Sequence, residues 1–113
     1  MRKAAFAAIL AFCATGSMAE VDKKTERTWK AKCASCHGVD GKGQTASAQQ
    51  VGLPDFSTPA WQKANTDEKI RKSISEGATK EKGGNKLEMD PYKDKLDAEQ
   101  IEKLIAYIRS LAG

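Results

Sequence analysis

The sequence predicts an all-α domain in which helical segments are joined by long loops. Apolar residues recur at helical spacing near both ends of the expected domain, and no run alternates convincingly with the period of a strand. Residues 38–63 contain several Gly and most of the Pro, which indicates a long ordered loop. Residues 77–95 are polar and Gly-rich, which is typical of a segment that is either disordered or functional. Helices without strands define the all-α class.

The first 19 residues have the pattern of a secretory signal peptide. Arg2 and Lys3 precede an apolar run over residues 4–13, and the small residues Ser17 and Ala19 are placed for cleavage after Ala19. The run is shorter than the roughly 20 residues that span a bilayer, so a retained membrane anchor is the weaker alternative. We expect residues 1–19 to be removed, and residues 20–113 to form one domain in the periplasm.

The expected mature chain has 113 − 19 = 94 residues, and a chain of this size usually needs a staple or a cofactor to support its thin core. Without Arg2 and Lys3, 17 of the 19 basic residues remain against 15 acidic ones, which leaves 17 − 15 = +2. This balance is not typical of nucleic-acid binding. Cys13 leaves with the leader, and a disulfide between Cys33 and Cys36 would close too short a loop to stabilise much. We therefore expect these two cysteines to have a chemical role.

The first helix is predicted from Val21 to near Gly38. This segment contains no Gly or Pro before Gly38, and it places Trp29, Cys33 and Cys36 at positions i, i+4 and i+7. Gly38 is a common type of C-terminal stop.

The second helix is predicted after Asn65 as N-cap, with Glu68 three residues later. Ile70 and Ile74 fall on one face, and Gly77 is the expected terminator. This segment is a short amphipathic helix.

The third helix is predicted after Asp97 as N-cap, with Gln100 as its capping-box partner. Five apolar residues at helical spacing form its buried stripe: Ile101, Leu104, Ile105, Ile108 and Leu111.

Cys33 and Cys36 lie in the stretch WKAKCASCHGVDGKG over residues 29–43, which admits three chemistries. A thioredoxin-like redox pair would lie at a helix N-terminus after a strand, whereas these cysteines fall at the C-terminal end of a predicted helix. A tetrahedral zinc site needs four ligands, and no second pair with suitable spacing follows. The third chemistry is attachment of haem c, because CASCH matches the signature C-x-x-C-H.

The C-x-x-C-H motif has the geometry that attachment needs. On a helix, Cys33 and Cys36 lie one turn apart on the same face, so both thiols can add to the two vinyl groups of one porphyrin. His37 then reaches the iron from the proximal side. The predicted export signal agrees with this chemistry, because bacteria attach haem c to a protein after its translocation. We predict one haem c with its iron, bound covalently at Cys33 and Cys36.

The second axial ligand follows by elimination. His37 is the only histidine, so this chain cannot provide bis-histidine ligation. Met1 and Met18 leave with the leader, which makes Met89 the only methionine of the mature chain. A lone methionine is most often core filler, but Met89 lies in a polar, Gly-rich segment with no helical stripe to join. The predicted iron ligands are His37 and Met89.

These features make the whole mature chain resemble the class I c-type cytochromes. The matching stretches are CASCHG at 33–38, LPDFS at 53–57, the Met89 segment with Pro91 and Tyr92, and LIAYIRSL at 104–111. The resemblance implies a cytochrome c-like fold, in which three to five helices with long loops wrap around one covalently bound haem.

The resemblance also implies roles for further residues. The N-terminal helix would cross the C-terminal one, with Tyr107 packed near Trp29. The backbone carbonyl of Pro54 would accept the Nδ1 proton of His37. Trp61 would donate its indole N–H to a haem propionate or serve as a core aromatic residue.

Two positions depart from the family pattern. Thr25 stands where relatives commonly carry glycine at the helix crossing, which predicts looser packing there. Asp90 separates Met89 from Pro91, and together with Glu88 it is expected to put negative charge near the haem and to favour ferric iron.

The expected function is one-electron transfer rather than catalysis, because the chain itself fills both axial positions of the iron. The expected partners are redox proteins of a respiratory chain: a donor dehydrogenase or cytochrome complex, and an acceptor oxidase or reductase. We expect a monomer without permanent membrane insertion and without a nucleic-acid partner. Eight lysines could steer an acidic partner, although acidic residues are interleaved with them: Lys30, Lys32, Lys42, Lys80, Lys82, Lys86, Lys93 and Lys95.

Two alternatives stay open at this point. In a haem sensor or ligand-binding module, Met89 would be displaced by a small gas or by a lysine such as Lys86. In the other alternative, the domain would dock permanently in a larger respiratory or dehydrogenase complex. A multihaem peroxidase is excluded because the sequence has one attachment motif.

Overall fold

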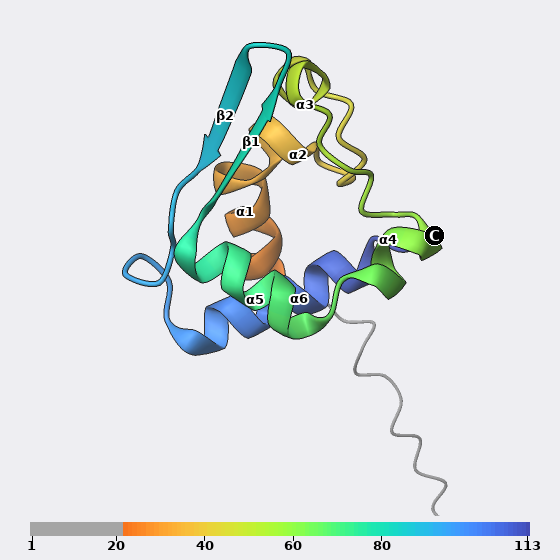
Figure 1. The fold of residues 1–113 in the computed structure, drawn as a ribbon. Helices are drawn as coiled ribbons and strands as arrows, with labels where there is room; N and C mark the ends of the chain where they lie inside the picture. Colours follow the sequence, from red (N-terminus) through yellow and green to blue (C-terminus); the bar gives the residue numbers. More distant parts are fainter. Residues whose placement is uncertain (1–21) are drawn as a thin grey trace, which may run out of the picture.

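A computed structural model describes residues 22–113, and the predicted signal peptide and its cleavage site lie outside them. Within this range the chain forms six helices and one two-stranded sheet (Figure 1). The elements are α1 (Lys23–Lys32), α2 (Ala34–His37), α3 (Ala46–Val51), α4 (Pro59–Ala64), α5 (Asp67–Glu76), β1 (Ala78–Lys82), β2 (Asn85–Met89) and α6 (Ala98–Ser110). The predicted mainly helical class is confirmed, with six helices in residues 22–113 where three to five were expected, and the small sheet is an addition to it.

The first predicted helix is divided in two. Asp22 caps α1 by accepting a hydrogen bond from the Thr25 N–H at 2.8 Å, and α1 ends at Lys32. Cys33 stays in the right-handed helical region with ψ of −35°, but its φ of −119° departs from the usual helical value, and α2 then forms one further turn that ends at Gly38. The helix therefore starts and stops near the predicted residues, but with a break at the first cysteine.

Helix α6 forms as predicted. The Asp97 side chain accepts from the Gln100 N–H at 2.8 Å, and the Gln100 side chain accepts from the Asp97 N–H at 2.9 Å, which completes the capping box. Four members of the predicted stripe are buried and Leu111 is half-buried. This face packs against α1 and α5 and supplies much of the core.

The expected crossing of the first and last helices is confirmed. Helices α1 and α6 are in contact, and the centroids of the Trp29 and Tyr107 rings are 5.2 Å apart. Thr25 is buried on α1, with 7% of its surface exposed. The crossing thus accommodates a threonine.

The prediction of a loop over residues 38–63 is wrong in two places, where α3 and α4 form. Thr45 caps α3 by accepting from the Ala48 N–H, and Thr58 caps α4 in the same way, with Pro59 as its first residue. Each helix has six residues, so neither has room for a repeating apolar stripe.

The predicted cap of α5 is wrong by one residue. The Thr66 hydroxyl accepts from the Lys69 N–H at 3.1 Å and is the N-cap. The side chain of Asn65 instead donates to the Trp61 carbonyl at 2.9 Å, at the end of α4. Ile70 and Ile74 are buried as predicted.

The polar segment after Gly77 forms a β-hairpin, which was not predicted. Gly83 and Gly84 connect its strands with φ of +56° and +88°, as a two-residue turn with two positive φ values requires. In Figure 1 the hairpin rises from the end of α5 towards α3, away from α6. Of its ten strand residues, Leu87 and Met89 are half-buried and the others are exposed, so the sequence shows almost no alternation.

Stability in acid should depend on Asp22. The hydrogen bond from Thr25 and the ion pair with Lys103 at 3.0 Å hold the pKa of Asp22 well below its usual value of 3.8. A carboxyl whose pKa is lowered by folding stabilises the protein above its unfolded pKa, and this contribution is lost as the pH falls. We expect Asp22→Asn to flatten the decline in unfolding free energy below about pH 4, as measured by urea titrations at several pH values. Parallel curves for Asp22→Asn and wild type would contradict this.

Candidate functional site

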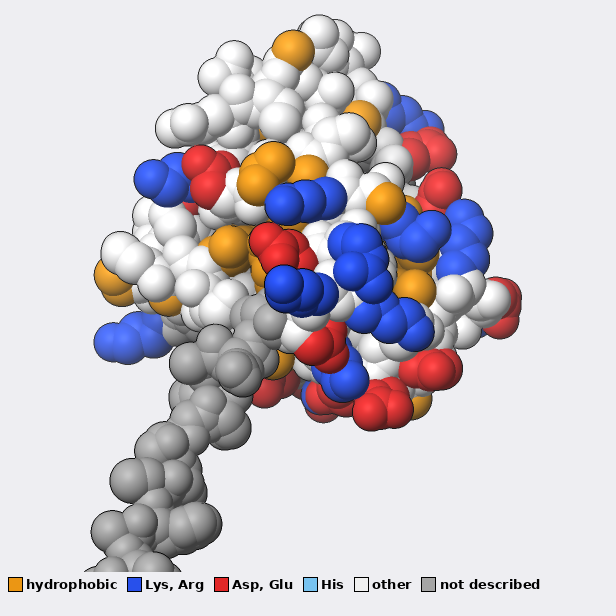
Figure 2. Space-filling model, turned by 180° about the vertical axis from the view of Figure 1, so that it is seen from behind, with side chains coloured by type: hydrophobic (Ala, Val, Ile, Leu, Met, Phe, Trp, Pro, Cys, Tyr) orange, Lys and Arg blue, Asp and Glu red, His pale blue; other side chains and the backbone are white. Residues whose placement is uncertain are grey.

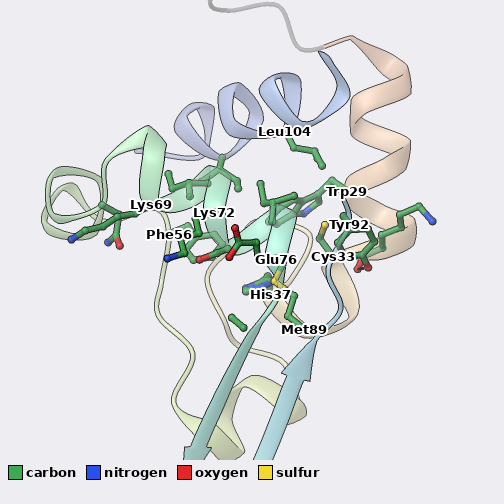
Figure 3. Close-up of a pocket in the computed structure, with 18 of the residues that line it drawn as sticks. Trp29, Cys33, His37, Phe56, Lys69, Lys72, Glu76, Met89, Tyr92 and Leu104 are labelled. Carbon is green, nitrogen blue, oxygen red and sulfur yellow. Dashed lines mark hydrogen bonds between the residues drawn. The ribbon is translucent and has the colours of Figure 1, made fainter. Parts of the chain in front are cut away.

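A cavity of about 500 Å³ lies between α1, α5, α6 and the start of the hairpin (Figure 3). Its apolar wall is formed mainly by Trp29, Phe56, Ile70, Ile74, Leu104 and Ile108. A second cavity of about 320 Å³ adjoins it under the hairpin. Six residues line both cavities: Lys32, Cys33, His37, Ala78, Met89 and Tyr92. The combined space has the size and apolar lining of a cofactor site.

The two cysteines lie at the junction of α1 and α2 and line these cavities. Both are half-buried free thiols, Cys33 lines both cavities, and Cys36 lines the smaller one. Burial raises the pKa of the Cys33 thiol to about 11. Because the thiolate is the reactive form, a thiol that stays protonated at neutral pH disfavours the redox-pair alternative. The described residues also hold no cluster of three or more His, Cys, Asp or Glu able to bind a metal.

His37 is the last residue of α2 and lines both cavities. Burial lowers its pKa, which favours the neutral imidazole that binds metals. Its Nδ1 is buried and finds no hydrogen-bond partner among residues 22–113.

The hydrogen bond expected from His37 Nδ1 to the Pro54 carbonyl is thus absent from this structure. Pro54 does line the larger cavity, but its carbonyl oxygen approaches Gly43, where it would lie 2.9 Å from an added Cβ. Pro54 therefore lies at the site without making the predicted contact.

Aromatic rings surround the imidazole. The Phe56 ring stacks on His37 with centroids 4.8 Å apart, and the Trp29 ring lies 6.0 Å away. The Trp29 indole N–H is shared between the carbonyls of Gly38 at 3.0 Å and Val39 at 3.2 Å, which fixes the chain just after His37. No local pattern predicts the Phe56 stack, since only the fold brings the two rings together.

Trp61 is half-buried and lines the larger cavity, with its ring centroid 4.3 Å from that of Phe56. This placement is compatible with both roles considered for it, as a propionate donor or as a core aromatic residue.

Met89 reaches the same cavities from the end of β2. It is half-buried, and Figure 3 shows its side chain beside the His37 ring at the centre of the pocket. The hairpin therefore brings the only methionine of residues 22–113 to the only histidine.

The charges around the site are mixed. Asp90 pairs with Lys95 at 3.5 Å and Glu88 with Lys86 at 3.2 Å, so the two acidic residues beside Met89 each have a basic partner. Lys69 and Lys72, which were not among the predicted lysines, also line the larger cavity. Figure 2 shows Lys and Arg side chains gathered on one face with Asp and Glu side chains among them.

The donor set fits a haem. The apolar cavities can cover a macrocycle, the two thiols stand in the C-x-x-C-H arrangement, and a neutral imidazole and a thioether lie together at the centre. The buried Nδ1 of His37 is the second nitrogen of an imidazole whose other nitrogen is available for a metal.

The comparisons with known proteins agree with this site. A solved structure of the KustC0563 c-type cytochrome is 28% identical and superposes with a TM-score of 0.64, covering 79% of this chain and 98% of that one. The structure of a mutant of the same cytochrome is 29% identical with a TM-score of 0.61, covering 77% of this chain and 96% of the mutant chain.

Two curated relatives are longer proteins. The cbb3-type cytochrome c oxidase subunit CcoP of Azospirillum brasilense is 26% identical over 91 residues, which are 80% of this chain and 28% of that subunit. The subunit FixP of Sinorhizobium medicae is 29% identical over 85 residues, which are 74% of this chain and 27% of FixP. This chain therefore spans less than a third of either subunit.

The sequence profile of the family described as Cytochrome c matches residues 23–112. None of the helices in residues 22–113 is long and apolar enough to span a bilayer. The match covers nearly the entire described domain, so the chain belongs to the cytochrome c family, whose members carry covalently bound haem c with its iron and transfer electrons.

Proposed function

We propose that this chain is a one-electron carrier of the periplasm, with the haem attached at Cys33 and Cys36 and its iron bound by His37 and Met89. The observation that supports this most is the meeting of His37 from α2 and Met89 from β2 at the same two cavities. Residues 20–113 would be the mature domain after removal of the leader.

The chain's own residues prepare the site for electron transfer. When bound, the haem supplies the one-electron exchange between ferric and ferrous iron. Burial keeps the His37 imidazole neutral, and the uncharged, soft thioether of Met89 favours ferrous iron and so raises the potential. The apolar wall around the cavity limits solvent reorganisation. If His37 and Met89 hold the iron as proposed, no coordination site would be left for a substrate, which supports a carrier rather than an enzyme.

Redox proteins are the proposed partners. The relatives named as oxidase subunits favour an acceptor of the oxidase or reductase class. The proposed donor is a dehydrogenase or cytochrome complex of a respiratory chain. Four lysines at the cavities form no ion pair within residues 22–113: Lys32, Lys69, Lys72 and Lys80. They would steer a monomeric carrier to an acidic partner surface, in an encounter that slows as ionic strength rises.

The proposed function is tested by exporting the protein in a bacterium that attaches haem c and measuring its intact mass under denaturing conditions. We expect the mass of residues 20–113 plus one haem, found in the periplasmic fraction, and one reversible one-electron wave in voltammetry. The variant Cys33→Ala/Cys36→Ala should lose the covalent haem. A haem that dissociates on denaturation of the wild type, or the absence of a reversible wave, would contradict the proposal.

A further inference from the structure

Gly77 lies where α5 meets the segment that carries Met89. Its φ of +84° and ψ of 175° belong to a region that is essentially restricted to glycine. A Cβ at this position would lie 2.6 Å from the carbonyl oxygen of Met89 and 3.1 Å from the nitrogen of Pro91. The backbone of Met89 is thus packed directly on a Cα that has no side chain.

Two hydrogen bonds fix the chain on the other side of this contact. The Tyr92 N–H donates to the Ile74 carbonyl at 2.9 Å, and the Lys93 N–H donates to the Ser75 carbonyl at 3.2 Å. These carbonyls belong to the last turn of α5, where carbonyl groups have no partner within the helix. The segment that follows Met89 is therefore seated on the C-terminal end of α5.

The hairpin holds Met89 from a third direction. Met89 pairs with Ala78 in the antiparallel register, and Ala78 directly follows Gly77. The backbone of Met89 is confined between the start of β1 and the end of α5. Its thioether is carried by this backbone on a flexible side chain with three rotatable bonds.

We propose that Gly77 is a positioning residue for Met89: its missing side chain lets the Met89 backbone sit against α5, and this contact sets how firmly Met89 holds the iron. The inference rests on the proposed function, because it takes Met89 as the axial ligand. A side chain at position 77 would push the Met89 carbonyl away and move the thioether. The flexible side chain would compensate in part, so the iron–sulfur bond should weaken rather than disappear.

Imidazole titration of the ferric holoprotein measures this effect. Imidazole competes with Met89 for the iron, so its apparent affinity rises as Met89 is held less firmly. Because displacing Met89 would relieve part of the backbone strain that a side chain at position 77 introduces, Gly77→Ala should increase the apparent imidazole affinity by roughly fivefold or more. Far-UV circular dichroism establishes that the variant retains its helices.

Gly84→Ala is the matched control in the same hairpin. Gly84 has a similar φ of +88°, but nothing lies within 4 Å of its added Cβ. Its imidazole affinity should stay within about twofold of wild type, since no contact with the ligand segment is disturbed. Equal affinities for Gly77→Ala and Gly84→Ala would overturn the inference.

Met89→Ala separates the inference from the proposed function. If Met89→Ala raises the imidazole affinity and Gly77→Ala does not, the positioning role alone is wrong. If Met89→Ala leaves the affinity unchanged, Met89 is not the ligand, and the axial assignment of the proposed function fails as well.

Should Gly77→Ala fail to fold, hydrogen exchange on the wild-type protein tests the positioning role of Gly77 instead. Coupling between two sites is reciprocal, so displacing Met89 with saturating imidazole should weaken the two hydrogen bonds that hold Tyr92 and Lys93 on the end of α5. We expect the Tyr92 and Lys93 amides to exchange faster by about tenfold, while the Ile105 amide in α6 changes little. Unchanged exchange of Tyr92 and Lys93 would show that their contact with α5 is not coupled to the binding of Met89 to the iron.

Discussion

Replacing Met89 by Ala is expected to let carbon monoxide bind the ferrous haem and to lower the midpoint potential. Methionine binds ferrous iron in preference to ferric iron, so its removal withdraws a stabilisation of the reduced state. A tenfold preference corresponds to about 59 mV for one electron, and we expect a decrease of at least this size in voltammetry. The variant should still carry covalent haem, because the attachment motif is intact.

Glu81→Ala provides the control for Met89→Ala. Glu81 lies in the same hairpin, is exposed, and lines neither cavity. Its potential should stay near that of wild type, and carbon monoxide should not bind. A Met89→Ala protein that keeps the wild-type potential and excludes carbon monoxide would show that another group binds the iron.

Replacing Trp29 by Ala is expected to produce the largest loss of stability. Only 1% of the Trp29 surface is exposed, and its ring lies near those of His37, Phe56 and Tyr107. Truncating a buried tryptophan costs about 3–5 kcal/mol, measured as the unfolding free energy of the holoprotein in urea. The carbonyls of Gly38 and Val39 also lose their shared donor, so the chain beside His37 should loosen.

The exposed neighbour Val39 offers a comparison for Trp29→Ala. The Val39 side chain is 59% exposed, so Val39→Ala should change the unfolding free energy by less than about 0.5 kcal/mol. If the two variants lose similar amounts of stability, Trp29 does not anchor the core in the way described above.

The sequence predicts best those features that depend on neighbouring residues. The capping box of Asp97 and Gln100 and the apolar stripe of α6 need only local spacing, and both form as expected. Met89 could be chosen by elimination, because the expected mature chain contains one methionine and one histidine. Its presence at the cavity beside His37 agrees with that choice, and its binding of iron stays a prediction.

The features that the sequence did not predict depend on short elements or on distant contacts. Helices α3 and α4 have six residues each and are marked only by the threonine caps Thr45 and Thr58. The hairpin is mostly exposed, so the turn at Gly83 and Gly84 was its main local signal. Gly77 could be identified as a helix terminator, but its contact with the Met89 carbonyl exists only in the folded chain.

The most direct test of the proposed carrier function is the optical spectrum of the purified wild-type protein. The oxidised protein should show the weak red charge-transfer band of methionine-ligated ferric haem, and the spectrum of the reduced protein should not change when carbon monoxide is added. This result would mean that Met89 is a firm sixth ligand. If the band is missing, or if carbon monoxide binds readily to the reduced protein, the sixth position is open or exchangeable, and a ligand-binding haem sensor would explain the site better.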